Sequence, residues 1–140
     1  LAIGEQTAEA VKIEIGAALS TKDQLEFELR GRDFVSGLPR DIVLKSNEVA
    51  DALTPYILEI ANSVQNVFNV TPPELVADIM GKGIILSGGG SQLRHLDEFF
   101  RRMTGVAAYW AEEPLFCVAR GAGLILSHLD VYKRTLLNKR

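Results

Sequence analysis

The stretch Gly83-Ile84-Ile85-Leu86-Ser87-Gly88-Gly89-Gly90-Ser91-Gln92-Leu93 is the part of the sequence around which the fold is organised. Its aliphatic run is bounded by glycines, which predicts a short buried strand. The three consecutive glycines predict a turn free of side chains, because glycine adopts positive φ without strain. We expect Ser91 to cap a helix that runs through Phe100 to Thr104. Such a turn beside a helix N-terminus suits a phosphate or the polar edge of a nucleotide, and the alternative is a tight connection that binds nothing.

Length and composition exclude several classes of protein. A chain of 140 residues is enough for one ordinary domain, and its net charge of -3 argues against a general nucleic-acid binder. The single cysteine, Cys117, excludes an internal disulfide and fits a reducing compartment. His95 and His128 stand alone, so no metal site is expected. No apolar run reaches the roughly 18 residues that a bilayer-spanning helix needs, and no signal peptide is visible.

Residues 7–19 predict a helix with two distinct faces. Apolar residues at helical spacing form its packing face: Ala8, Val11, Ile15 and Ala18. A second face carries Glu9, Lys12, Ile13 and Gly16. Two interpretations of this second face stay open. Glu9 and Lys12 form a solvated ion pair worth about 0.5 kcal/mol or less, or they form a nucleotide edge at which the carboxylate meets ribose hydroxyls and Gly16 allows close approach.

Residues 24–44 predict a small antiparallel meander. Apolar and charged residues alternate strictly over 24–30, which is typical of a half-buried strand, and 42–44 give a second short strand. Turns are expected at 31–33 and 36–39.

A long helix is expected over residues 47–69, with Ser46 or Asn47 as its cap. Pro55 interrupts the hydrogen-bond ladder of this helix. It therefore predicts a kink, or a fresh start with Thr54 as the cap.

From Pro72 onward the predicted order is helix, strand, helix, strand, helix. Pro73 occupies the first turn of a short helix, whose packing face is Leu75, Val76, Ile79 and Met80. After the central strand and its helix, residues 106–111 predict a strand. Glu112-Glu113-Pro114 then starts the last main helix. This alternation indicates an α/β layer arrangement, into which residues 23–70 are inserted.

The last main helix carries Gly121 and Gly123 in its interior. Each costs about 1 kcal/mol relative to alanine, which suggests that another backbone or a ligand approaches there, with tight helix packing as the alternative. The tail after His128 predicts a further amphipathic helix, and its basic residues Lys133, Arg134, Lys139 and Arg140 are expected to be solvated.

Several nucleotide-binding and catalytic motifs are missing. The segment Leu86-Ser87-Gly88-Gly89-Gly90 looks like the signature loop of ABC transporter ATPases, but the chain has no G-x-x-x-x-G-K-S/T phosphate loop. A dinucleotide fingerprint fails because Leu93 stands where a third small residue is needed. No Ser-His-Asp or Cys-His arrangement has supporting local sequence.

The remaining motifs together resemble the C-terminal part of the MreB family of bacterial actin-like rod shape-determining proteins. The likeness runs from Leu1 to about Asp130. It is carried by Ile3-Gly4-Glu5 with Thr7-Ala8-Glu9, Val11-Lys12-Ile13-Glu14-Ile15-Gly16, Arg30-Gly31-Arg32-Asp33 with Ser36-Gly37-Leu38-Pro39, Thr71-Pro72-Pro73-Glu74-Leu75, Gly88-Gly89-Gly90 with Leu93-Arg94, and Glu112-Glu113-Pro114-Leu115 with Val118-Ala119-Arg120-Gly121-Ala122-Gly123. Two residues depart from the family pattern. Ser87 replaces a usual threonine, and His95 replaces a usual glycine, which is expected to alter the start of the following helix.

The resemblance implies the second lobe of an actin-like ATPase, an α/β fold of the ribonuclease H-like kind with a small α+β inserted subdomain. Residues 1–20 and 72–127 would form the inner subdomain of this lobe, and residues 21–71 its outer subdomain. Residues 128–140 would be a C-terminal tail. Gly121 and Gly123 would lie in the helix that returns to the first lobe, near the hinge.

The resemblance also implies a site for ATP. Glu9 and Lys12, with Ile13 beside them, would contact the adenosine from one side. Gly88, Gly89, Gly90, Ser91 and Gln92 would hold the adenine and ribose from the other side. Mg²⁺ and the groups that activate water would come from the first lobe, so that this fragment by itself is expected to hydrolyse no ATP.

For the intact protein, the resemblance implies ATP binding, polymerisation into filaments, slow hydrolysis, and guidance of cell-wall synthesis and rod shape. Its partners would be copies of itself, cell-wall elongation proteins and membrane-anchored morphogenesis proteins. It would be cytoplasmic and membrane-associated, with no membrane contact from this segment and no nucleic-acid partner. Two alternatives stay open: the lobe of a related enzyme such as a small-molecule kinase, and a filament with another role such as organelle positioning.

Overall fold

The structure is a computed structural model that describes residues 1–137 of the chain. Its helices are α1 (Glu5–Ile15), α2 (Ser46–Val70), α3 (Pro73–Lys82), α4 (Leu96–Thr104), α5 (Cys117–Ser127) and α6 (Leu129–Leu137). Its strands are β1 (Glu26–Arg32), β2 (Pro39–Lys45), β3 (Ile84–Leu86) and β4 (Ala108–Trp110). Short 3₁₀ helices lie at Gly89–Gln92 and Pro114–Phe116.

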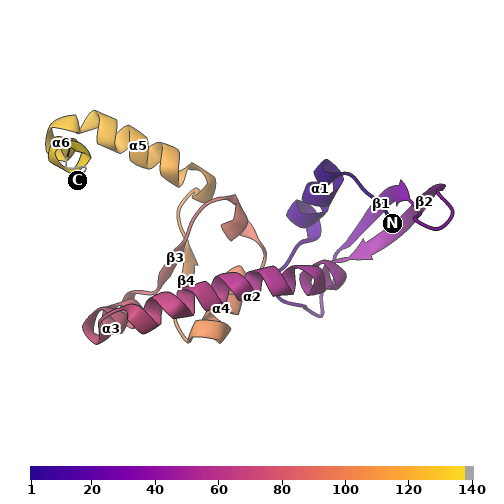
Figure 1. The fold of residues 1–140 in the computed structure, drawn as a ribbon, viewed down its shortest axis with the longest axis horizontal. Helices are drawn as coiled ribbons and strands as arrows, with labels where there is room; N and C mark the ends of the chain where they lie inside the picture. The colour runs from indigo at the N-terminus through magenta and orange to yellow at the C-terminus, as the bar shows by residue number, and fades with distance from the viewer. Residues whose placement is uncertain (138–140) are drawn as a thin grey trace.

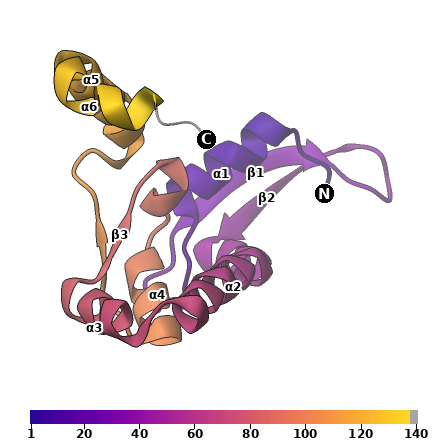
Figure 2. The ribbon, with the colours of Figure 1, turned by 60° about the vertical axis from the view of Figure 1, so that its left-hand side comes forward.

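The elements form two packed regions that α2 joins (Figure 1). In one region α1 packs on the β1–β2 hairpin, and in the other the β3–β4 pair packs on α4. The long helix α2 contacts α1, β2 and α4, so it belongs to both regions. Helices α5 and α6 follow β4 and stand apart from the two regions in both views (Figure 2).

The β1–β2 hairpin confirms the predicted antiparallel strands, since the two strands pair along their whole lengths. The two predicted turns, however, are one hairpin tip. Gly31 and Arg32 belong to β1 because the N-terminal segment pairs with the end of this strand: the Ala2 N–H donates to the Arg32 carbonyl at 2.7 Å, and the Arg32 N–H donates back at 2.9 Å.

The predicted end of the first helix at Leu19 is wrong, because α1 ends at Ile15. Gly16 leaves the helix with extended backbone, and Ala17 pairs with Arg94 in a parallel bridge. The Ala18 N–H donates to the Arg94 carbonyl at 2.8 Å. Residues 17 and 18 therefore exchange helical hydrogen bonds for bonds to the segment that follows the glycine turn.

The long helix α2 runs through Pro55 as one element, so the predicted fresh start with Thr54 as cap is wrong. The Thr54 hydroxyl donates to the Ala50 carbonyl one turn back, at 2.8 Å, as a residue inside a helix does. Ile57 and Ala61, just beyond the proline, are 5% and 0% exposed. We attribute the continuity of α2 to this burial, which offsets the one backbone hydrogen bond that Pro55 removes.

The second region confirms the predicted order of helix, strand, helix, strand, helix. β3 and β4 pair in parallel, from Ile84 opposite Ala108 to Leu86 opposite Trp110. The predicted packing face of α3 is wrong in part, because Leu75 and Met80 are 54% and 65% exposed. α3 lies at one end of the molecule (Figure 1), and none of its residues is buried.

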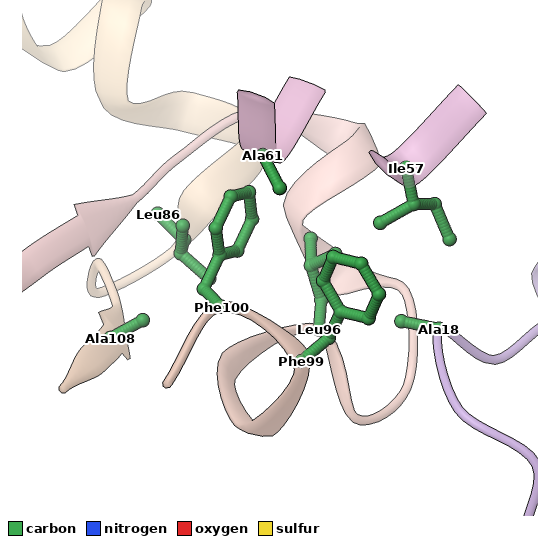
Figure 3. Close-up of a cluster of buried hydrophobic side chains, with 8 residues drawn as sticks. All are labelled: Ala18, Ile57, Ala61, Leu86, Leu96, Phe99, Phe100 and Ala108. Atoms are coloured by element: carbon green, nitrogen blue, oxygen red, sulfur yellow. The ribbon is translucent and has the colours of Figure 1, made fainter. Parts of the chain in front are cut away.

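Two hydrophobic clusters hold the regions together. The larger one joins α2, β3, α4, β4 and the segment that follows α1, and Figure 3 shows its side chains converging: Ala18, Ile57, Ala61, Leu86, Leu96, Phe99, Phe100 and Ala108. The rings of Phe99 and Phe100 meet edge to face, with centroids 6.1 Å apart. A smaller cluster of Val11, Ile15 and Leu29 fixes α1 on the hairpin.

The helix after the glycine turn does not begin at Ser91, so the predicted capping role of Ser91 is wrong. Gly89–Gln92 form a 3₁₀ turn, and the α-helix begins after His95. His95 has φ 60°, the left-handed conformation that glycine adopts most readily. The histidine that departs from the family pattern therefore occupies a position whose backbone favours glycine. The helix ends at Thr104 with Gly105 following, as predicted.

Helices α5 and α6 bear out the predicted helices near the C-terminus, although α5 begins at Cys117, after a 3₁₀ turn at Pro114. A Cβ at Gly121 or Gly123 would meet nothing within 4 Å among the described residues. No backbone of the described chain approaches these glycines. The predicted tail residues Lys139 and Arg140 lie outside the described residues.

Asp33 holds the hairpin tip in place. Its Oδ1 accepts the N–H groups of Val35 at 2.8 Å and Ser36 at 2.9 Å, and its Oδ2 lies 3.0 Å from Arg40 Nη1. These donors, first of all the Ser36 N–H, lower the pKa of the Asp33 carboxyl. Because the folded-state pKa lies below the unfolded one, the carboxylate stabilises the fold above a pH of about 3.9 and this stabilisation is lost as the pH falls.

We therefore expect Asp33→Asn to lower the free energy of unfolding at neutral pH, and this deficit to shrink as the pH falls below about 3.9. Urea unfolding at a series of pH values measures it. Asp23→Asn, in the exposed loop before β1, controls for loss of a negative charge without loss of the tip contacts. A deficit of Asp33→Asn that stays constant into strong acid would contradict this account.

His95→Gly is expected to raise the free energy of unfolding by up to about 1 kcal/mol. Glycine relieves the strain of the left-handed conformation, which is about 1–2 kcal/mol. The greater chain entropy of glycine in the unfolded state offsets about 0.5–1 kcal/mol of this gain. Thermal unfolding measures the change. His128→Gly is the matched control, since His128 has φ -127° and should gain nothing. A loss of stability in His95→Gly would mean that the imidazole makes contacts worth more than the strain.

Candidate functional site

The structure brings the opening helix and the glycine turn together. The Ala17–Arg94 bridge places the C-terminal end of α1 next to the segment that follows the turn. α2 supports both, since it contacts α1 and α4. The two segments that the sequence suggested as opposite sides of a nucleotide site, about 80 residues apart in the chain, are therefore neighbours in space.

A cavity of about 240 Å³ lies where these segments meet, and we call it the glycine-turn cavity. α1 and the residue after it contribute Lys12, Ile13 and Gly16, and the turn contributes Gly89, Gly90, Gln92 and Leu93. α2 closes a further side with Leu53, Tyr56, Ile57 and Ile60. Pockets that bury a drug-sized ligand have about 300–1,000 Å³, so this cavity suits one ring system and not a whole nucleotide.

Five of the eight predicted site residues line this cavity: Lys12, Ile13, Gly89, Gly90 and Gln92. The other three lie beside it. Glu9 is one turn earlier on α1, with its carboxylate 4.0 Å from the Lys12 ammonium. Gly88 begins the turn, with φ 85°. Ser91 is only 7% exposed and faces inward.

Hydrogen bonds from three directions fix the glycine turn. The Gly88 N–H donates to the Pro114 carbonyl at 2.8 Å, and the Ser91 hydroxyl donates to the Gly88 carbonyl at 2.7 Å. From β4, the Trp110 indole N–H donates to the Ser91 carbonyl at 2.7 Å. The turn is thereby preorganised, and Ser91 and Trp110 act as residues that position it.

Sequence reasoning missed the contribution of α2. Leu53, Ile57 and Ile60 belong to the apolar stripe that predicted a core-facing helix. Their spacing does not show which of them contact the core and which line a cavity. Tyr56, which is 69% exposed, gave no signal either, because it follows Pro55 at a point where we expected a helix start. No sequence pattern indicated the hydrogen bond from Trp110 to the glycine turn.

The chemistry of the cavity is apolar with one cationic edge. Lys12 is its one charged lining residue, and the side chains of Lys12 and Glu9 are 51% and 63% exposed, so their ion pair is weak. Branched apolar side chains from α1 and α2 and the side-chain-free turn suit the two faces of a flat ring. Among residues 1–137 no cluster of three or more His, Cys, Asp or Glu side chains lies close enough together to hold a metal ion.

Comparisons with known proteins agree on one family. The family model described as MreB/Mbl protein matches residues 1–134. The cell shape-determining protein MreB of Escherichia coli (strain K12) is 42% identical over 137 residues, which are 98% of this chain and 40% of that protein. The cell shape-determining protein Mbl of Bacillus subtilis (strain 168) is 42% identical over 130 residues, which are 93% of this chain and 39% of that protein.

Solved structures give the same result. MreB5 of Spiroplasma citri bound to ADP superposes with a TM-score of 0.88 at 33% identity, over 99% of this chain and 41% of that chain. MreB5 bound to AMPPNP gives 0.89 at 33% identity. These likenesses confirm the predicted actin-like α/β fold. The chain spans about 40% of the length of the relatives that it matches.

Gly16→Ala tests how tightly the chain turns at the end of α1, next to Leu93 of the segment after the glycine turn. A Cβ at Gly16 would collide with the Lys12 carbonyl oxygen and lie 3.1 Å from Leu93 Cδ1. We expect a loss of about 1–3 kcal/mol in the free energy of unfolding, because the Lys12 carbonyl is backbone and cannot move aside, whereas the end of the Leu93 side chain can. Gly4→Ala, whose Cβ would meet nothing within 4 Å, is the control and should be nearly neutral. Chemical denaturation of both variants measures the difference, and equal stabilities would show that the approach is looser than described.

Proposed function

The chain belongs to the MreB/Mbl family, and from this premise we propose that the glycine-turn cavity holds the adenine base of ATP in a protein that contains this chain. One observation carries the proposal. Lys12 and Ile13 from the opening helix meet Gly89, Gly90 and Gln92 from the glycine turn around a single cavity. Its volume of about 240 Å³ suits a base and leaves the ribose and phosphates outside.

Several lining residues and their neighbours have a part in this proposal. The backbone of Gly89 and Gly90, without side chains, lets one face of the base approach closely, and Ile13 and Ile60 cover apolar surface. The exposed Gln92 offers an amide for the polar edge of the base. Lys12 and Glu9, at the mouth, are placed for ribose hydroxyls and for the negative charge that follows them. Gly88 and Ser91 act by holding the turn.

Binding of Mg²⁺ and activation of water are assigned to residues outside this chain. The proposal rests on the chain spanning about 40% of its relatives, and on the chemistry of the cavity, whose one charged group is an ammonium. When bound, ATP would supply the phosphoanhydride that is hydrolysed. The residues of this chain would bind and orient the adenosine part.

At the level of the whole protein, we infer an actin-like filament that binds ATP, hydrolyses it slowly and organises cell-wall synthesis and rod shape. The relatives are described as cell shape-determining proteins, which matches this function and not the small-molecule kinase alternative. This proposal includes self-assembly and association of the whole protein with the membrane. It also includes two kinds of partner, namely cell-wall elongation proteins and membrane-anchored morphogenesis proteins. None of the helices among the described residues combines the length and apolar character that crossing a membrane requires.

We also propose the division of the chain that the resemblance implied. Residues 1–20 and 72–127 would be the inner subdomain of one lobe, residues 21–71 its outer subdomain, and residues 128–140 a tail. The site would then lie where the two subdomains meet. The Ala17–Arg94 bridge joins residues 1–20 to residues 72–127, and α1 also packs on the β1–β2 hairpin and α2, which supports this placement.

Isothermal titration of the 140-residue chain with ATP tests the proposal. We expect weak binding and no hydrolysis, since the cavity contacts the base alone. Lys12→Ala is expected to weaken binding about fivefold, the equivalent of about 1 kcal/mol for an exposed charge. Lys22→Ala, in the exposed loop before β1, is the control and should leave the affinity unchanged.

Two results would contradict this account. Micromolar ATP affinity or measurable turnover would mean that the chain holds more of the site than the cavity indicates. The nucleotide would lie elsewhere if Lys12→Ala left the ATP affinity unchanged and if the nuclear magnetic resonance signals that shift on ATP addition came from residues other than Gly89 and Gly90.

A further inference from the structure

A second cavity, of about 530 Å³, lies farther along the groove between α1 and α2, next to β2. We call it the hairpin-side cavity. Its lining residues are Ile3, Glu5, Ala8, Glu9, Val11, Lys12, Leu44, Glu48, Val49, Ala52 and Leu53. Lys12 and Leu53 also line the glycine-turn cavity, so the two cavities share a wall. Glu9, which also lines this second cavity, belongs to the proposed nucleotide site as well, and the other lining residues have no part in that site.

The hairpin-side cavity has an apolar floor. Val11, which is 5% exposed, lies at the bottom, and Leu44, Val49 and Leu53 are half-buried around it. The exposed alanines Ala8 of α1 and Ala52 of α2 also line the cavity, and their side chains are small. The volume falls within the range of about 300–1,000 Å³ that small-molecule sites show.

Carboxylates dominate the charged lining residues of this cavity. Glu5, Glu9 and Glu48 contribute three negative charges, and Lys12 contributes one positive charge. Among the ion pairs of the described residues, Lys12 with Glu9 at 4.0 Å is the one that involves this lining. Glu48 accepts the Lys45 N–H with Oε2 at 2.9 Å, which leaves its other oxygen for a further donor. The first turn of α1 places Glu5 beside the same opening.

We propose that the hairpin-side cavity is a second ligand site, which takes a small amphipathic cation. The apolar body of such a molecule, an aromatic ring or a branched aliphatic group, would lie on Val11, Val49 and Leu53. Its ammonium or amidinium group would lie at the rim, toward Glu5 and Glu48. The size of the cavity favours a small molecule over a helix of a partner protein, because helix-in-groove binding needs anchors over several turns.

The proposal does not rest on the nucleotide site. The residues that carry it, Glu5, Ala8, Glu48, Val49 and Ala52, do not line the glycine-turn cavity. Lys12 and Leu53 line both cavities. A ligand that fills the hairpin-side cavity would therefore restrict these two side chains, and this restriction is a further measurable effect. The two sites can therefore fail or hold independently of each other.

Three phenyl compounds of the same length test the proposal on the 140-residue chain: phenylbutylamine, phenylbutanol and phenylbutyrate. They share an apolar body and differ in charge. Titrations followed by nuclear magnetic resonance give the affinity and the location at once. We expect shifts in Ala8, Val11, Val49 and Ala52 with the amine, about three- to fivefold weaker binding of the alcohol, and still weaker binding of the carboxylate.

Two pairs of variants separate the floor from the rim. Ala52→Phe fills the cavity and should abolish binding of all three compounds, whereas Asn62→Phe, an exposed position on the same helix outside the lining, should not. Glu5→Gln should weaken the amine about twofold and leave the alcohol unchanged. Glu14→Gln, an exposed glutamate of α1 outside the lining, is its control.

Three outcomes would overturn the proposal. Equal affinities for the amine and the carboxylate would remove the role of the glutamates. Shifts confined to Gly89 and Gly90 would place the compounds in the glycine-turn cavity. Absence of saturable shifts in α1 and α2, in a spectrum whose dispersed amide signals show a folded chain, would show that the cavity binds no ligand of this class.

Discussion

The short parallel bridge between Ala17 and Arg94 is the contact on which the site depends. The chain leaves α1 at Gly16, and the bridge pairs the next residue with the segment after the glycine turn. With this bridge, the end of the opening helix lies against the turn, and Ala18 enters the larger hydrophobic cluster beside Ile57 and Phe99. A backbone hydrogen bond of 2.8 Å, protected by that cluster, thus joins two segments that are far apart in sequence.

The sequence was informative wherever one local cause determines the structure. Alternation over residues 24–30 predicted β1, glycines and aliphatic residues predicted β3, and the Pro72-Pro73 pair predicted the start of α3. These are responses of the backbone to its own residues and immediate neighbours. The family motifs then supplied the actin-like fold, which local patterns cannot specify.

The sequence failed where a distant segment competes for backbone hydrogen bonds or burial. The first helix was predicted too long because the partner of Ala17 lies near residue 94. Of the two outcomes predicted at Pro55, the fresh start with Thr54 as cap fails because burial of Ile57 and Ala61, which carries α2 past Pro55, is a tertiary effect. Likewise, the five predicted residues at the glycine-turn cavity were suggested by spacing and family likeness. The α2 side chains that complete it depend on how three elements pack.

Pro55 has a mechanical consequence for the cavities. It lies between the part of α2 that packs near the hairpin, at Val49, and the part that packs on the strand pair, at Ile57 and Ala61. A proline inside a helix removes one hydrogen bond of the ladder, which makes that turn the most compliant point of the rod. Any bending of α2 between the β1–β2 hairpin and the β3–β4 pair would therefore be concentrated there. Leu53 and Tyr56, on either side of Pro55, both line the glycine-turn cavity, so bending of α2 at this proline would change the width of that cavity.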